Sequence, residues 1–213
     1  MTVHSASRAR YPLGSVVSRP RPQTPLAAWA RERLTGRVRR RVEGVARRAA
    51  TRLGQHLGPA WRVVHPPDPD PGAVGDDHAG FVAIGPSGVF AVSVVDHGRQ
   101  RVMIAGDVIQ IQGRRPPYVA RARRYARRIR NALTDAVGTN VPVVAVLTFA
   151  GSGAISAHGL PTGCLAVSLR ELGVVLRAAK QRIAPETARK LAEVAAHPLT
   201  WRNRGGTRHD TAR

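Results

Sequence analysis

Hydrophobic and polar positions alternate along the chain with two different periods, which separate helical from extended segments. Within residues 25–57, apolar residues recur at steps of three and four, the spacing of one face of an α-helix. They are Leu34, Val38, Val42, Val45, Ala49, Leu53 and Leu57. Thr24 and Pro25 are typical of an N-cap and of a first helical residue. The pattern predicts a helix over 25–57 whose apolar face packs on a sheet.

After Gly58 the pattern changes to short apolar runs separated by turn residues, which is typical of strands. The expected strands are 61–65, 81–84, 89–95, 101–104, 108–111, 141–149 and 164–167. The run 89–95 is apolar at nearly every position, as expected of a strand buried on both faces, so we place it at the centre of the sheet. The runs 101–104 and 108–111 flank a Gly-Asp turn and predict a hairpin at the sheet's edge.

Helical spacing returns in three later segments. One apolar stripe with arginines on both sides predicts a helix from 117 to 137, and its members are Val119, Ala122, Ala126, Ile129 and Leu133. Ser168 and Pro185 are typical helix starts, and they predict shorter helices over 168–180 and from 185 to just before Pro198.

This order of elements predicts an α/β fold with a mixed central β-sheet flanked by helices. The two ends of the chain are rich in Arg, Pro, Ser and Gly and lack periodicity, so we expect them to be disordered. The predicted organisation is a basic arm at 1–24, one domain at 25–200 made of the basic helix 25–57 and an α/β core at 58–200, and a basic tail at 201–213.

Charge and cysteine content narrow the classes of function. The 213 residues include 34 Lys+Arg and 13 Asp+Glu, a net charge of +21, which predicts DNA, another polyanion or an anionic membrane as partner. The excess lies mainly in 1–53, 114–135 and 201–213. A single cysteine, Cys164, excludes an internal disulfide and a multi-cysteine zinc site. Without a membrane-spanning run or a secretory signal, we expect a cytoplasmic protein.

Several local strings are similar to one known family. The most specific is Ile84-Gly85-Pro86-Ser87-Gly88-Val89-Phe90, and the others are Trp61 to His65, Gly106-Asp107-Val108 before the arginine-rich helix, and Val141-Pro142-Val143. These strings resemble the nuclease-related domain (NERD) family of the PD-(D/E)XK, restriction-endonuclease-like superfamily, and the resemblance covers about residues 37–195. The resemblance implies a restriction-endonuclease-like core.

The resemblance also implies where the family's chemistry would lie. Its members carry an acidic residue before the Gly-Pro strand and an Asp-x-Lys on the next strand, positions that fall here on Gly80, Ser93 and Val95. Two carboxylates hold a magnesium ion, which activates water, and the lysine stabilises the developing charge. Glycine, serine and valine do not supply these groups. We therefore expect a pseudoenzyme with no cofactor and no metal.

A displaced active site is the alternative. Asp77 and Asp96 lie close in sequence to the degenerate positions, and Glu43 lies where relatives carry a glutamate that completes the metal shell. An active protein of this kind would be a magnesium-dependent nuclease. Strand alternation argues against Asp96, because it places that side chain on the face opposite Ser93 and Val95.

The favoured hypothesis is a non-catalytic DNA-binding protein that contacts phosphates with little regard to sequence. The candidate contacts are Arg37, Arg39, Arg40, Arg41, Arg47, Arg48, Arg121, Arg124, Arg127 and Arg128. A third hypothesis is a membrane-surface or scaffold protein, in which the basic N-terminal helix docks on anionic lipid through Leu26, Trp29 and Leu34.

Overall fold

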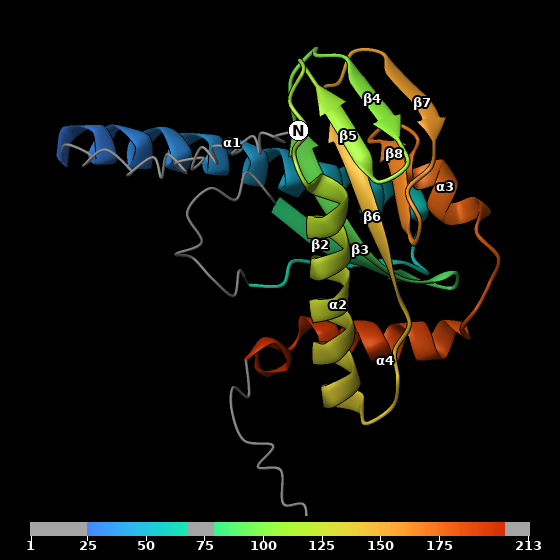
Figure 1. The fold of residues 1–213 in the computed structure, drawn as a ribbon. Helices are drawn as coiled ribbons and strands as arrows, with labels where there is room; N and C mark the ends of the chain where they lie inside the picture. The colour runs from blue at the N-terminus through green and yellow to red at the C-terminus, as the bar shows by residue number, and fades with distance from the viewer. Residues whose placement is uncertain (1–24, 68–78, 203–213) are drawn as a thin grey trace, which may run out of the picture.

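The computed structural model describes residues 25–67 and 79–202, with the side chains of 25–36, 38 and 39 left undescribed. Four α-helices and one short 3-10 helix occur in these ranges (Figure 1). They are α1 (Pro25–Leu57), α2 (Tyr118–Val137), α3 (Leu172–Ala178), α4 (Pro185–Ala196) and η1 (Pro198–Trp201). The predicted arm at 1–24 and the tail from 203 onward lie outside the described residues.

A five-stranded mixed sheet forms the centre of the molecule, as predicted. Its strands, in spatial order, are β1 (Arg62–Val64), β2 (Ala79–Gly85), β3 (Gly88–Asp96), β6 (Val143–Ala150) and β8 (Cys164–Ser168). Strand β2 is antiparallel to both β1 and β3, whereas β3, β6 and β8 run parallel to one another. The prediction that the run 89–95 is central is confirmed, because β3 is the middle strand and is buried at seven of its nine positions.

Helices cover both faces of this sheet, which gives three layers (Figure 1). Alternate residues of β3 separate the two cores. Phe90, Val92 and Val94 pack on the side of α1 and α3, whereas Val89, Ala91 and Val95 pack on the side of α2 and α4. The apolar stripe predicted for α2 is the face that this helix buries, and the stripe predicted for α1 is buried from Val42 to Leu57; the side chains of Leu34 and Val38 are not described.

The hairpin of β4 (Val102–Ala105) and β5 (Val108–Ile111) does not extend the main sheet, and the prediction that it lies at the edge of that sheet is wrong. It forms a second sheet, ordered β5-β4-β7, with β7 (Ile155–Gly159) running parallel to β4. The sequence did not predict β7. Four of its five residues are exposed, so it lacks the apolar alternation that marks a half-buried strand.

Two boundaries near the C-terminus differ from expectation. Ser168 and Glu171 bond reciprocally through side chain and backbone, the geometry of a capping box, but regular helix begins only at Leu172. Trp201 was predicted to begin the tail, yet it is 8% exposed and its indole N–H donates to the Ala195 carbonyl at 2.8 Å. A buried indole fixed in this way belongs to the core, so the domain continues to Trp201.

Candidate nucleic-acid interface

The three positions assigned to the family's chemistry lie together on one face of the main sheet. Gly80 of β2 is the cross-strand partner of Ser93 on β3. Val95 is two residues further along β3 and therefore points to the same side, toward α2. Ser93 is 0% exposed and Val95 is 2% exposed. The positions are gathered as the resemblance implies, but they are covered.

Tyr125 of α2 covers this place. A Cβ atom built on Gly80 would lie 2.9 Å from a ring carbon of Tyr125 and 2.7 Å from the Val92 carbonyl oxygen. Both distances are too short for real carbon contacts, so no residue larger than glycine fits without movement of the strand and the ring. Neither the donor set nor the space fits a magnesium ion here.

Asp96 lies on the opposite face of β3, as strand alternation predicted. Its carboxylate accepts a hydrogen bond from Arg41 Nε of α1 at 3.1 Å and one from the Gly98 backbone N–H at 2.9 Å. The Asp96 side chain is only 7% exposed. The carboxylate thus anchors α1 to the end of β3, away from Gly80, Ser93 and Val95.

The remaining acidic candidates do not join these positions in the described ranges. Glu43 lies on α1, across the sheet from Gly80, and Asp77 lies outside the described residues. Within those same ranges, no group of three or more His, Cys, Asp or Glu side chains comes together in a way that could hold a metal ion.

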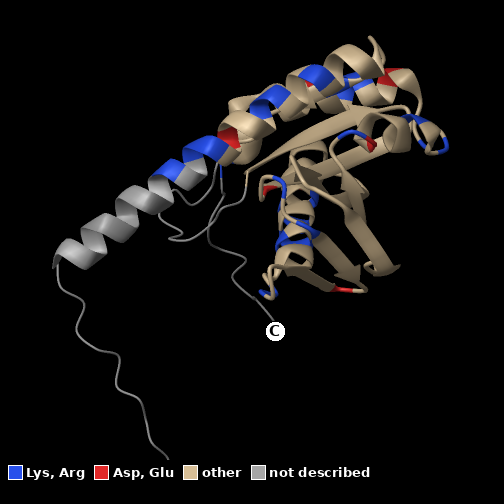
Figure 2. Ribbon diagram, turned by 90° about the horizontal axis from the view of Figure 1, so that it is seen from above, with Lys and Arg blue, Asp and Glu red and all other residues tan. Residues whose placement is uncertain are grey.

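Exposed arginines follow one another along the outer face of α1, and their positions on the ribbon are blue in Figure 2. The predicted contacts on α1 whose side chains are described are all exposed, namely Arg37, Arg40, Arg41, Arg47 and Arg48; the side chain of Arg39 is not described. Arg52 was not among the predicted contacts, but it is exposed and extends the row by one turn. Arg52 lies four residues after Arg48 and therefore on the same helix face, and this spacing could have identified it as a contact. We call Arg47, Arg48 and Arg52 the α1 triplet.

A shallow hollow of about 450 Å³ lies beside the α1 triplet. Gly44 and Thr51 line it together with the three arginines. Gly44 carries no side chain, and a guanidinium nitrogen of Arg48 lies 3.4 Å from where its Cβ would be. Three guanidinium groups around one hollow suit an anion such as a phosphate, since each guanidinium presents several N–H donors in a fixed fork.

The arginines of α2 are divided between solvent and structural contacts. Arg124, Arg127 and Arg130 are exposed, whereas Arg121 and Arg128 are half-buried. Arg121 lies over the Tyr118 ring at 6.0 Å, and Arg128 donates to the Pro67 carbonyl at 2.9 Å. Of the four contacts predicted on this helix, Arg124 and Arg127 are therefore the two most open to a partner.

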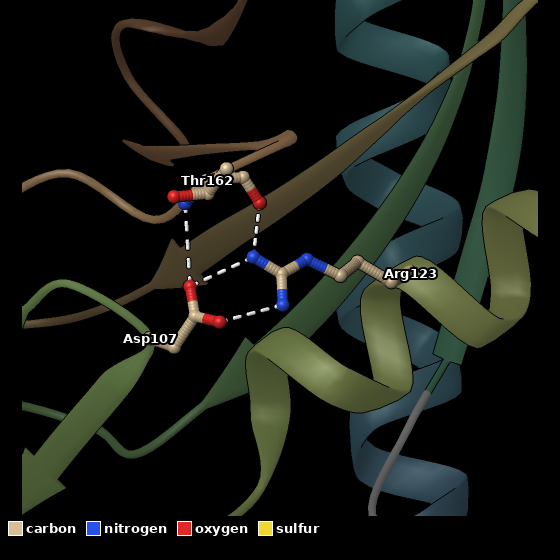
Figure 3. A network of polar contacts seen from close by, with 3 residues as sticks. All are labelled: Asp107, Arg123 and Thr162. Atoms are coloured by element: carbon tan, nitrogen blue, oxygen red, sulfur yellow. Dashed lines mark hydrogen bonds and ion pairs between the residues drawn. The ribbon is translucent and has the colours of Figure 1, made fainter.

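Arg123 has a structural role instead (Figure 3). Its guanidinium binds the Asp107 carboxylate through two hydrogen bonds of 2.6 and 2.7 Å and also donates to the Thr162 carbonyl. Thr162 N–H in turn donates to Asp107 at 3.2 Å. The hydrogen bonds from Arg123 hold the pKa of Asp107 below its ordinary value. This network holds both the β4–β5 turn and the loop between β7 and β8 against α2.

The two arginine surfaces lie on opposite faces of the sheet, and each has an arginine near the segment that follows β1. Burial, and then the positive charge of Arg47, lower the pKa of His65, while Arg128 binds the carbonyl of Pro67. The segment 65–67 therefore lies between the two helices. The sequence suggested one set of contacts, and the fold separates it into two surfaces.

Comparison with known proteins finds no matching family model, no matching curated protein and no matching solved structure. No helix among the described residues is both long and apolar enough to cross a membrane.

Proposed function

We propose that this chain is a degenerate nuclease-related domain protein of the cytoplasm that binds double-stranded DNA through phosphate contacts and does not cleave it. The observation that carries the proposal is the arginine surface of α1. The α1 triplet lies on a rigid helix that is held to the sheet by its buried apolar face. A row of fixed cations of this kind is suited to a phosphate backbone.

The charges of this surface are available to a partner. Within the described part of the chain, the α1 triplet and Arg124, Arg127 and Arg130 form no ion pair with a carboxylate. By contrast, Arg189 and Lys190 on α4 pair with Glu193 and Glu186. Exposed cations without acidic neighbours keep their full electrostatic attraction for polyanions.

The aromatic residues favour duplex over single-stranded nucleic acid. Binding of single strands relies on exposed rings on which bases stack. Among the rings whose side chains are described, which do not include Trp29, only Tyr125 is not buried, and it is half-buried against Gly80. The buried ones are Trp61, Phe81, Phe90, Tyr118, Phe149 and Trp201. With no open ring among the described side chains, we expect phosphate contacts to be the main source of affinity, and these carry little sequence information.

The lack of cleavage is supported by the packing of the degenerate positions. Ser93 and Val95 are closed off from solvent, and Tyr125 occupies the space that a side chain on residue 80 would need. The packing of Asp96 argues against the alternative of a displaced nuclease site formed by Asp77 and Asp96. The Asp96 carboxylate already accepts hydrogen bonds from Arg41 and Gly98 on the other face of the sheet.

A fluorescence-anisotropy titration tests the proposal. Labelled duplexes of unrelated sequence are titrated with the protein over a range of salt concentrations. We expect similar affinities for all sequences and a steep decrease with salt, because each phosphate contact releases a counterion. A second arm incubates plasmid DNA with protein and magnesium or manganese. Cleavage that disappears in Asp77→Ala or Asp96→Ala would replace the proposal with the displaced nuclease.

A further inference from the structure

Four exposed arginines gather at the open end of the β4–β5 hairpin, where β4 begins and β5 ends. Arg101 directly precedes Val102, the first residue of β4, and Val102 is the register partner of Ile111, the last residue of β5. Ile111 in turn exchanges two backbone hydrogen bonds with Arg114, of 2.9 and 3.0 Å. This pairing brings the segments 99–101 and 114–115 together. We call their arginines the hairpin cluster: Arg99, Arg101, Arg114 and Arg115.

A tight turn fixes Arg114 in this place. Gln112 and Gly113 have φ values of 49° and 75°, and a type I′ turn requires positive φ at both of its central residues. The turn reverses the chain, so that Arg114 lies beside Ile111. The prolines at 116–117 then restrict φ up to the start of α2. The two arginines between the turn and the prolines are thus carried on a restrained backbone.

A second loop holds the other segment of the hairpin cluster. Gly153 N–H donates to the Gln100 carbonyl at 3.0 Å, and Val102 N–H donates to the Ala154 carbonyl at 3.1 Å. A Cβ on Gly153 would lie only 2.6 Å from the Arg99 carbonyl oxygen, so the two loops are in close contact. Arginines on a fixed backbone lose less conformational freedom on binding than arginines on a mobile one, and this favours binding.

The positive charge of the hairpin cluster is available to a partner. In the described ranges, none of its four arginines forms an ion pair with a carboxylate. The acidic residues of the neighbouring segments are already bound, since Asp96 accepts a hydrogen bond from Arg41, and Asp107, at the other end of the hairpin, binds Arg123. The cluster therefore attracts polyanions.

Asp96 places the hairpin cluster next to the arginines of α1. Its carboxylate accepts hydrogen bonds from Arg41 Nε at 3.1 Å and from the Gly98 N–H at 2.9 Å, so one side chain joins α1 to the residue before Arg99. The Arg41 side chain remains 68% exposed. Positive charge thus continues from α1, past the end of β3, to the hairpin.

We propose that the hairpin cluster is a second phosphate-binding surface, which contacts the same DNA duplex as α1. This inference rests on the proposed DNA binding and adds a second surface to it. The sequence did not indicate this surface, because 12 residues separate Arg101 from Arg114 and only the pairing of β4 with β5 brings them together.

The surroundings of the cluster favour a duplex over a membrane or a single strand. Surfaces that bind membranes combine cations with apolar side chains that enter the lipid. In the described part of the chain, no large apolar side chain that is exposed lies within 99–101 or 112–117. Tyr118, the aromatic residue that follows, is 3% exposed, so its ring is closed to the bases of a single strand.

The salt dependence of duplex binding tests the hairpin cluster. One variant replaces its four members: Arg99→Ala, Arg101→Ala, Arg114→Ala and Arg115→Ala. The charge-matched control removes four other exposed cations: Lys180→Ala, Arg182→Ala, Arg189→Ala and Lys190→Ala. Each lost phosphate contact lowers the slope of log affinity against log salt by about 0.9. We expect a slope lowered by about two to four in the cluster variant and nearly unchanged in the control.

A lysine variant separates the loss of charge from any change of structure. Its substitutions are Arg99→Lys, Arg101→Lys, Arg114→Lys and Arg115→Lys. Because it keeps all four charges, we expect its slope to stay close to that of wild type, and circular dichroism checks that each variant is folded. A wild-type slope in the folded alanine variant would overturn the inference. A slope lowered equally in the lysine variant or in the control would overturn it as well.

The α1 triplet distinguishes a failure of this inference from a failure of the proposed function. If replacement of the α1 triplet by alanine lowers the slope and replacement of the hairpin cluster does not, DNA binding stands and the second surface is refuted. If wild type binds no duplex at any salt concentration, both are refuted.

Discussion

The ring of Tyr125 lies against the backbone of Gly80, where any larger residue would place its first side-chain atom. A Cβ at position 80 would be 2.9 Å from the ring and 2.7 Å from the Val92 carbonyl oxygen. The contact joins α2 to β2 directly opposite Ser93. The place where the family resemblance puts metal chemistry is thus part of the packed core between helix and sheet.

This relationship predicts that Gly80→Ala destabilises the protein. Overpacking a well-filled core costs about 1–3 kcal/mol, and here a backbone carbonyl and a packed ring would both have to move. Urea unfolding measures the change. Gly44→Ala is the matched control, because Gly44 lies on α1 where alanine is the better helix former, and we expect it to raise stability by about 0.5–1 kcal/mol.

Tyr125→Ala tests the cause of that loss. Removing the ring relieves one of the two close contacts, so Gly80→Ala should cost less stability in the Tyr125→Ala background than in wild type. An equal cost in both backgrounds would show that the ring does not fill this space.

Most of the fold follows from periodicity in the sequence. The apolar stripes of α1 and α2 and the continuous apolar run of β3 identify these elements, because burial of one helix face or of both strand faces leaves a regular pattern. Strand alternation also places Asp96 correctly. Strand β7 leaves no such pattern, since its residues are small and mostly exposed.

The candidate site was less predictable than the fold. The sequence identifies the arginines, but it does not say which of them are already bound to another part of the folded chain. Arg123 binds Asp107 and Arg128 binds Pro67, and these partners lie 16 and 61 residues away in the chain. The closure of the degenerate positions depends on Tyr125, a residue that only tertiary packing brings to β2. Local sequence patterns carry neither relationship.

The Asp107–Arg123 network predicts a contribution to stability that depends on pH. The pKa of Asp107 is lowered in the folded protein, so its stabilising effect is complete above the ordinary carboxyl value of about 4. The effect is lost as the pH falls through the lowered value. Urea midpoints measured between neutral and acid pH should therefore decrease less in Asp107→Asn than in wild type. Parallel curves for the two proteins would contradict this role.

Cys164 is predicted to be unreactive in the folded protein. Burial raises the pKa of its thiol to about 11, and the residue is 6% exposed. The nucleophilic thiolate is therefore scarce at neutral pH. A thiol-reactive disulfide reagent should label the native protein slowly and the urea-unfolded protein at once. Rapid labelling of the native protein would show that β8 is more open than its packing indicates.

The central claim is that the α1 triplet binds the phosphate backbone, and its most direct test is the salt dependence of duplex binding. The triple variant Arg47→Ala, Arg48→Ala, Arg52→Ala is compared with the charge-matched control Arg182→Ala, Arg189→Ala, Lys190→Ala, which removes three exposed cations near and on α4. Each lost phosphate contact lowers the slope of log affinity against log salt by about 0.9. We predict a slope lowered by about two to three for the α1 variant and nearly unchanged for the control. Equal slopes for the α1 variant and wild type would contradict the account.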